Sequence, residues 1–421
     1  MLLRKSPEEI ARRASVSIDA ATLHGAQTIL DEVRSGGEPA LRRVAERLGD
    51  VKPGEPLVLD RAAIATVAAG VPRDQVELLE RTASRIRVFA QAQRDTLHSL
   101  DMAVPGGRAG HFIAPMDAAG CYAPGGRYPL PSSVLMTAIT ARVAGVRTVV
   151  VASPKPTPIT IAAAHVAGAD MLLAVGGAQA VGAMTFGIGT TAPAIPRCDV
   201  IVGPGNRWVT AAKKLVQGEV AIDMLAGPSE LLIIADETAD PAAVAADLLA
   251  QAEHDTDAVP TLVTTSESLV ARVNAELEKQ LATLPTAATA RAALNNGGVV
   301  LAASIDDAIT IADRVAPEHL QVMTRDARAV AEKLSHYGAV FIGSRSAEIF
   351  GDYGVGPNHV LPTAGTARFS AGLSVFHFLR IRTWLEMNAP DLAAAVRDAA
   401  TLARLEGLEA HARAAEQRLR V

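Results

Sequence analysis

Short runs of aliphatic and β-branched residues recur along the chain from about residue 108, and each run ends at Gly, Pro, Ser or Asp. Runs of this length and composition are typical of buried β-strands. Helical patterns separate most of them, for example over residues 131–145 and 158–169. The predicted strands lie within residues 147–154, 170–177, 199–205, 230–236, 260–266, 297–303 and 338–344.

This alternation of strand and helix predicts an α/β fold. Continuous apolar strands separated by helices form parallel sheets that are covered on both faces. There are too many such units for one sheet, so we expect two doubly wound (Rossmann-like) parallel-sheet domains. The first ~100 residues look mainly helical, and Ser6, Pro7 and Glu9 predict a capped helix start. The last ~30 residues form an amphipathic helical pattern, so small helical elements should lie at both ends.

Composition narrows the class of function. At 421 residues and 49% hydrophobic content, the chain is long enough for more than one core. A net charge of -5 gives no basic field for nucleic acid or an anionic membrane. The apolar stretch 171–184 is broken by paired glycines and reads as a buried strand and turn, so we expect no membrane span. Two cysteines build no disulfide framework, and the N-terminus lacks a secretory pattern, which favours the cytoplasm.

Three glycine-rich turns follow predicted strands, at Gly125-Gly126, Gly176-Gly177 and Gly203-Pro204-Gly205-Asn206. Glycine at such a turn allows close backbone approach to a ligand and leaves helix N-terminal amides free. None of them matches the dinucleotide fingerprint G-x-G-x-x-G, and each alone could be a plain sheet turn. Their shared position at the carboxyl ends of strands favours a ligand crevice.

Residues 247–255, "DLLAQAEHD", end a predicted helix with polar side chains where the apolar stripe should continue. Asp240-Pro241 starts this helix, which would place Gln251 and His254 on neighbouring turns of one face. An amide oxygen and an imidazole nitrogen at that spacing can hold one metal ion, but for this pair taken alone a capped helix end with a hydrogen-bonded histidine is the simpler interpretation. A His, Asp and Gln set would suit zinc better than calcium.

Further ligands for such an ion would have to come from distant segments. Asp352 and His359 lie in the glycine-rich stretch "GDYGVGPNH", which suits a tight, shaped turn. His411 lies on the polar tail helix, five residues after Glu406. The spacing alone does not establish that these residues meet.

The adjacent Glu318 and His319 of "APEHLQ" form a second candidate for chemistry. One interpretation is the N-terminal turn of a helix, with a favourable first-turn carboxylate. The other is an acid/base pair, since burial can tune both groups toward neutral pH.

Seven motifs in a fixed order make the chain resemble histidinol dehydrogenase along nearly its whole length. The resemblance extends to the C-terminal stretch "LEGLEAHARAAEQRLRV". The seven motifs are "GCYAPGGRYPLPSSVLM", "GGAQAVGAM", "VGPGNRWV", "IDMLAGPSELLIIAD", "DLLAQAEHD", "APEHLQ" and "GDYGVGPNHVLPT".

The resemblance implies a zinc-dependent, NAD-linked enzyme that oxidises L-histidinol through an aldehyde to L-histidine. Carried over by motif, Glu318 and His319 would be the catalytic pair. The implied zinc ligands are Gln251, His254, Asp352 and His411. The implied NAD contacts are Tyr122, Gln179 and Asn206. Histidinol would be held by Ser229, Glu406 and His319 together with the metal ligands, and His359 would support the substrate side.

The resemblance also implies a homodimer in which the tail helix of one subunit completes the site of the other. We expect a larger, discontinuous α/β domain that contains the metal and catalytic residues and is formed by residues 17–121 and 229–370. A second α/β domain on the NAD side should comprise residues 122–228. Residues 1–16 and 371–421 should form terminal elements. Related branches oxidise other small polar alcohols such as sulfonated diols, but Glu406 and His411 favour histidinol. Outside this class, a metal-dependent hydrolase or a metabolite-binding protein stays open.

Overall fold

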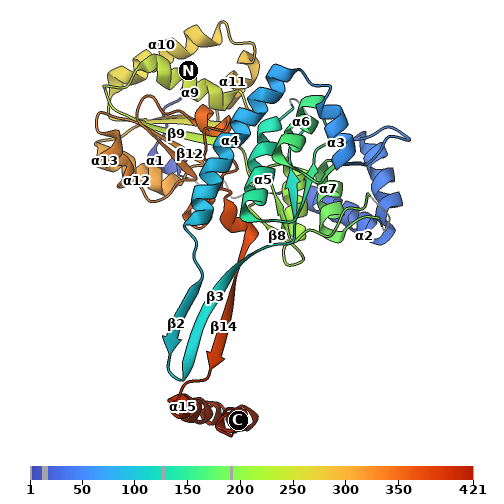
Figure 1. Cartoon of the computed structure of the whole chain (residues 1–421). Helices are drawn as coiled ribbons and strands as arrows, with labels where there is room; N and C mark the ends of the chain where they lie inside the picture. The colour runs from blue at the N-terminus through green and yellow to red at the C-terminus, as the bar shows by residue number, and fades with distance from the viewer. Residues whose placement is uncertain (1, 12–17, 126–128, 190–192, 421) are drawn as a thin grey trace.

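Two parallel-sheet lobes stand side by side in the computed structural model, and a long arm projects from between them (Figure 1). The structure describes residues 2–11, 18–125, 129–189 and 193–420. The α/β class with two doubly wound sheets is confirmed, because helices cover both faces of each sheet. Gly126 of the first glycine turn lies outside the described residues.

The first lobe is built on a six-stranded sheet of order β1-β6-β5-β4-β7-β8. All neighbouring strands are parallel except β1, which runs antiparallel to β6. The strands are β1 (Val58–Asp60), β4 (Ala118–Tyr122), β5 (Thr148–Ala152), β6 (Met171–Leu173), β7 (Val200–Val202) and β8 (Ala221–Ile222). Their side chains are mostly buried on both faces, which explains their continuous apolar sequence.

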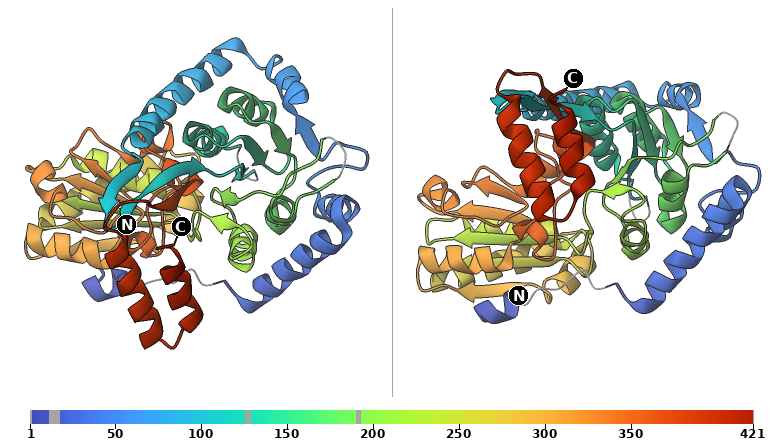
Figure 2. Two further views of the ribbon diagram at one scale, coloured as in Figure 1. Left: turned by 60° about the horizontal axis from the view of Figure 1, so that its bottom comes forward. Right: turned by 90° about the horizontal axis from the view of Figure 1, so that it is seen from below.

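Helices of the first lobe form two packed groups on opposite faces of this sheet (Figure 2). One group contains α2 (Ala20–Leu48), α7 (Gly177–Phe186) and α8 (Arg207–Leu215), and the other contains α3 (Arg61–Ala68), α4 (Arg73–Asp95), α5 (Pro131–Ala144) and α6 (Pro158–Ala167). One continuous hydrophobic core runs through all of them. Within α2 the chain leaves the helical conformation at Gly37, where φ is 55°.

The second lobe is built on a five-stranded parallel sheet of order β11-β10-β9-β12-β13. Its strands are β9 (Glu230–Ala235), β10 (Val259–Thr264), β11 (Gly298–Leu301), β12 (His319–Met323) and β13 (Ala339–Ile342). Leu231 and Ile233 face one core with α9 (Pro241–Ala252), α10 (Glu267–Leu281) and α11 (Ala287–Ala293). Leu232 and Ile234 face the opposite core with α12 (Ile305–Val315) and α13 (Ala327–Ala331). This alternation is the two-residue period of a doubly covered strand.

The short N-terminal helix α1 (Pro7–Ile10) belongs to the second lobe. The predicted capping box is present, since Ser6 Oγ accepts from the Glu9 amide and the Glu9 carboxylate accepts from the Ser6 amide. The preceding segment lies along β11, where the Lys5 amide donates to Val299 O at 3.0 Å.

The projecting arm consists of an antiparallel sheet of order β14-β3-β2 that carries a helical hairpin at its tip (Figure 1). Its elements are β2 (Leu100–Val104), β3 (Gly107–Pro115), β14 (Leu379–Met387), α15 (Leu392–Leu405) and α16 (Glu409–Gln417). The chain between β13 and the arm forms α14 (Glu348–Asp352) and the 3-10 turns η1 (Thr366–Arg368) and η2 (Val375–Phe378). The predicted amphipathic tail is therefore the end of this arm.

Strand pairing corrects the predicted division of the chain. Residues 17–121 were expected to join the catalytic sheet, but within this stretch β1 and β4 pair in the six-stranded sheet, and α2 to α4 pack on it. Residues 229–370 supply the five-stranded sheet without them. The first lobe consequently has the larger core. Among the described residues, no helix combines the length and apolar composition that crossing a bilayer requires.

Candidate metal and catalytic centre

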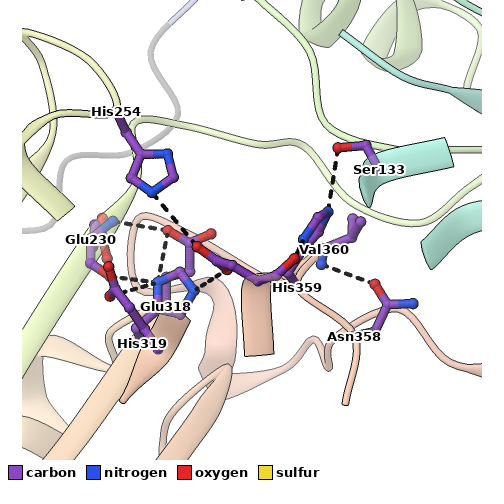
Figure 3. Close-up of polar contacts among 10 residues, drawn as sticks. Ser133, Glu230, His254, Glu318, His319, Asn358, His359 and Val360 are labelled. Atoms are coloured by element: carbon purple, nitrogen blue, oxygen red, sulfur yellow. Dashed lines mark hydrogen bonds and ion pairs between the residues drawn. The ribbon is translucent and has the colours of Figure 1, made fainter. Parts of the chain in front are cut away.

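Acidic and imidazole side chains gather at the amino-terminal edge of the five-stranded sheet, facing the first lobe (Figure 3). Glu318 and His319 stand at the start of β12, and Glu230 begins the neighbouring strand β9. The sequence "APEHLQ" is thus the start of a central strand, and its interpretation as a helix N-terminal turn is wrong. Glu318 lies in the bend before β12, so its side chain reaches the same edge as that of His319.

His319 has one ring nitrogen engaged and one without a hydrogen bond. Its Nδ1 lies 3.1 Å from the carbonyl oxygen of Glu230, whereas its Nε2 is buried and makes no hydrogen bond within the described residues. A carbonyl oxygen only accepts, so in the neutral ring Nδ1 carries the proton and Nε2 has a free lone pair. His319 is therefore oriented to accept a proton at Nε2.

Asp352, at the end of α14, lies between two histidines. Its Oδ2 is 3.6 Å from His254 Nε2 and its Oδ1 is 3.8 Å from His319 Nε2. Burial acts to raise the pKa of this carboxyl, but His254 and His319 outweigh burial and hold the pKa below its usual range. The contact with Asp352 in turn raises the pKa of His254.

Three glutamates surround this group, of which Glu318 and Glu348 are buried and Glu230 is partly exposed. Burial raises the pKa of Glu318 to about 7 and that of Glu348 to about 8. Burial and the neighbouring charge of Glu318 raise the pKa of Glu230 to about 7. Burial alone would lower the pKa of His319, but the nearby carboxylates of Glu318, Glu348 and Asp352 raise it to about 10. The centre therefore has an excess of negative groups. A cation bound there would offset them and lower the pKa of His319, and only then would the ring be neutral and able to accept a proton at Nε2.

Ligand atoms of His254, Glu348 and Asp352 lie within 4.8 Å of one another, close enough to hold one metal ion. Gln251, in the last turn of α9, is fully buried, and its amide nitrogen can donate to Glu348 Oε2 at 3.2 Å and to Glu230 O at 3.3 Å. His254 follows the helix end in a turn. The structure thus brings three of the four predicted ligands, Gln251, His254 and Asp352, to one place and adds Glu348.

His411 and Glu406 do not join this centre within one chain. Glu406 caps α15 and His411 belongs to α16, both exposed at the far end of the arm (Figure 1). Ser229 does lie beside the centre, directly before Glu230, and its carbonyl oxygen accepts from the Val259 amide at 3.0 Å.

The three residues predicted to contact NAD lie together in the first lobe. Tyr122, Gln179 and Asn206 line one cavity of about 490 Å³ at the carboxyl ends of the six-stranded sheet. The Tyr122 hydroxyl accepts from the Gly177 amide at 3.2 Å. Asn206 Oδ1 caps α8 by accepting from Trp208 N at 3.0 Å. Parts of all three glycine turns line this cavity, as expected for a crevice at strand ends.

His359 joins the two lobes. Its Nδ1 lies 2.9 Å from Asp352 O, and its Nε2 lies 3.3 Å from Ser133 Oγ in the first turn of α5 (Figure 3). Pro129, shortly before α5, lines the cavity. His359 and the start of α5 therefore connect the acidic centre to a segment that lines the cavity.

The sequence analysis did not identify Glu230 and Glu348 of the acidic centre, or Asp50, which lines the cavity and accepts from Gln179 Nε2 at 2.7 Å. Glu348 and Asp352 are four residues apart on one short helix, a spacing that places two carboxylates on one face and could have indicated the pair. Glu230 and Asp50 carried no such local signal, because each meets its partners only through the tertiary fold.

The fold and these two sites define a bilobal α/β protein with a candidate cation centre beside a cavity of nucleotide dimensions. The family model for histidinol dehydrogenase matches residues 12–419, so the chain belongs to the histidinol dehydrogenase family.

Individual relatives cover the same extent. The chain is 44% identical to histidinol dehydrogenase of Thermus thermophilus, over 96% of this chain and 97% of that protein. It is 46% identical to histidinol dehydrogenase of Halobacterium salinarum, over 93% and 91% of the two chains. The crystal structure of histidinol dehydrogenase from Elizabethkingia anophelis is similar with a TM-score of 0.92 at 31% identity, over 100% of this chain and 98% of that one.

Proposed function

We propose that this protein oxidises L-histidinol to L-histidine in two successive NAD-linked steps through L-histidinaldehyde, in histidine biosynthesis in the cytoplasm. Membership of the histidinol dehydrogenase family supports the reaction. The observation that carries the proposal is the buried Nε2 of His319, which has a free lone pair in the neutral ring and faces the acidic centre.

A zinc ion fits the acidic centre. Its side chains offer imidazole, carboxylate and amide ligands, the excess negative charge needs a cation, and ligand atoms of His254, Glu348 and Asp352 already converge. We assign Gln251, His254 and Asp352 as ligands from one chain and His411 of the partner subunit as the fourth. When bound, zinc would hold the amine and imidazole of the substrate and offset part of the negative charge around His319.

A homodimer would bring the missing residues to this centre. The arm exposes large apolar side chains on one face of its three-stranded sheet, namely Leu100, Met102, Ile381 and Leu385. A three-stranded sheet of this kind is stabilised by packing against another layer. A second copy packed on the arm would cover this face and let α15 and α16 reach the opposite centre. Glu406 and His411 would then hold the substrate there.

The first oxidation needs a base at the hydroxyl of histidinol. His319 accepts that proton at Nε2 while the carbinol carbon gives up a hydride, and the hydrogen bond from Nδ1 to Glu230 O fixes the ring during the transfer. Tyr122, Gln179 and Asn206 would hold the dinucleotide in the cavity, and NAD bound there would supply the hydride acceptor. Alcohol and NAD then give aldehyde, NADH and one proton.

The second oxidation needs water added to the aldehyde. Glu318 is buried with its Oε2 bonded to the Glu230 amide at 2.8 Å and 3.7 Å from His319 Nδ1. Burial keeps the pKa of Glu318 near neutrality, at about 7, which suits a base that takes one proton from water. The resulting hydrate loses a second hydride, which gives histidine and a second NADH.

Counting NADH per substrate tests this function directly. L-histidinol with excess NAD should give two NADH for each histidinol consumed, and the activity should disappear after chelation and return with zinc. One NADH per substrate would contradict the two-step reaction. Turnover of a sulfonated diol without turnover of histidinol would contradict the substrate.

A further inference from the structure

Two charged side chains line the cavity of the first lobe, among the residues that the structure describes. They are Asp50, directly after α2, and Lys155, in the loop after β5. The remaining lining is apolar, glycine or neutral and polar. A phosphate group in the cavity would therefore be repelled near Asp50 and attracted near Lys155.

Asp50 is held rigidly against the glycine turn at the start of α7. Helix α2 ends at Gly49 with φ of 75°, and the Asp50 amide donates back to Ala45 O at 2.8 Å. Its Oδ2 accepts from the Gly176 amide at 3.1 Å and from Gln179 Nε2 at 2.7 Å. Within the described residues Oδ1 makes no hydrogen bond, so one carboxylate oxygen keeps its capacity to accept.

The same turn has little capacity left for an anion. A glycine turn at a helix N-terminus commonly binds phosphate through its free amides. Here the Gly176 amide donates to Asp50 and the Gly177 amide donates to the Tyr122 hydroxyl at 3.2 Å. A carboxylate thus occupies the place that a phosphate would take, and the free acceptor there fits a hydroxyl group.

We propose that Asp50 is the residue that makes this cavity select NAD over NADP. The inference rests on the proposed function, in which this cavity holds the dinucleotide. Asp50 accepts a hydrogen bond from a ribose hydroxyl of NAD, and it repels the additional phosphate that NADP carries on its ribose. By orienting the amide of Gln179, the same carboxylate also shapes the wall against which the cofactor lies.

Lys155 explains why the effect should be large. Its Nζ lies 3.8 Å from the position of a Cβ built on Gly49, so the cation is close to the end of α2 that carries Asp50. Its backbone has φ of 45°, a conformation rare outside glycine, between Pro154 and Pro156. With Asp50 neutralised, Lys155 becomes the one charged side chain among the described lining residues, and it would attract a phosphate.

Equilibrium binding to the zinc-loaded, full-length protein tests the proposal. NAD and NADP are titrated by calorimetry into the wild type and into Asp50→Asn, Asp50→Ala and Asp306→Asn. Asparagine at position 50 can still accept from Gly176 N and Gln179 Nε2, so its Kd for NAD should change less than about threefold. The ratio of the Kd for NADP to that for NAD should fall at least about tenfold in this variant, equivalent to about 1.4 kcal/mol.

The other variants separate charge from position. Asp50→Ala removes the acceptor of two hydrogen bonds, so it should also weaken NAD binding, by about tenfold. Asp306→Asn removes an exposed carboxylate in α12 of the other lobe and should leave both Kd values unchanged. This control excludes a general effect of net charge.

The outcomes distinguish this inference from the proposed function. Absence of NAD binding by the wild type would contradict the proposed function, and the selectivity of Asp50 would fail with it. NAD binding with an unchanged NADP to NAD ratio in Asp50→Asn would overturn the selectivity alone. Equal weakening of both cofactors in Asp50→Asn would also overturn it, because a purely structural role affects both alike.

Discussion

The buried pair of Lys213 and Asp223 gives a quantitative test of how the first lobe holds the loop from Gly203 to Asn206. Lys213 in α8 contacts Asp223, which follows β8, and the side chains are only 3% and 0% exposed. Lys213 Nζ also donates to Gly203 O at 3.1 Å, and Asp223 Oδ2 accepts from the Gly203 amide at 2.7 Å. Both groups therefore fix the loop that starts at Gly203 and ends with Asn206 in the cavity.

The magnitude follows from what each substitution leaves behind. Asp223→Asn leaves a buried ammonium group without its counter-charge, which should lower the free energy of unfolding by about 4 kcal/mol. Lys213→Met leaves a carboxylate that still accepts from the amides of Gly203 and Met224, so the loss should be about 3 kcal/mol. The double variant Lys213→Met/Asp223→Asn buries no charge, and its loss should be at least about 2 kcal/mol below the sum.

Urea unfolding followed by tryptophan fluorescence measures these values. Trp208 lies in the same helix as Lys213, and a Trp384→Phe background leaves it as the only tryptophan. Glu77→Gln in the exposed pair with Arg73 is the matched control and should not move the midpoint measurably. Losses below about 1 kcal/mol for both single variants, or strictly additive losses, would refute the reasoning.

Three further predictions address the acidic centre. Glu318→Gln keeps the contact with the Glu230 amide but removes the base, so single-turnover oxidation of the aldehyde should slow by about 100-fold or more and that of the alcohol much less; equal losses would contradict its role with water. Mixed dimers of His411→Asn and His319→Asn chains should regain one working site in two, whereas no recovery of activity would show that each chain completes its own site. Because burial raises the pKa of Glu230 from 4.5 to about 7, the folded state retains a proton that the unfolded chain releases, so stability should fall as pH rises through this range. Glu230→Gln should flatten that part of the stability profile in urea titrations, and an unchanged slope would count against the shift.

Local sequence patterns predicted the elements well. The seven aliphatic runs are strands β5, β6, β7, β9, β10, β11 and β13. The prediction that the side chain of Gln251, at the polar end of α9, points into the interior is confirmed, because Gln251 is fully buried. These features depend on side-chain periodicity and on Gly, Pro and capping residues, all of which act within a few residues.

Strand partners and distant members of the centre could not be predicted in the same way. Strand β1 pairs with β6 across more than a hundred residues, and nothing within Val58–Asp60 specifies that partner. The prediction that residues 17–121 join the catalytic sheet failed for this reason. The sequence "APEHLQ" is compatible with the start of a helix, because a proline followed by an acidic residue is common in a first helical turn. Local sequence alone therefore could not distinguish a helix from a strand here. The central position of β12 between β9 and β13 decides for a strand.

The two lobes face each other with different ends of their strands, and His359 makes hydrogen bonds to both lobes. The first lobe presents the carboxyl ends of its strands, where the cavity lies, and the second presents the amino ends, where the acidic centre lies. Burial lowers the pKa of His359 and keeps the ring neutral. The Asp352 carbonyl oxygen can only accept, so Nδ1 of His359 carries the proton and donates to it. Nε2 then accepts from the Ser133 hydroxyl, so one tautomer makes a hydrogen bond to each lobe. A cationic side chain at this position would compete with a metal ion for the carboxylates. A neutral imidazole holds the lobes together without adding charge, and it leaves the negative potential of the centre available to the cation.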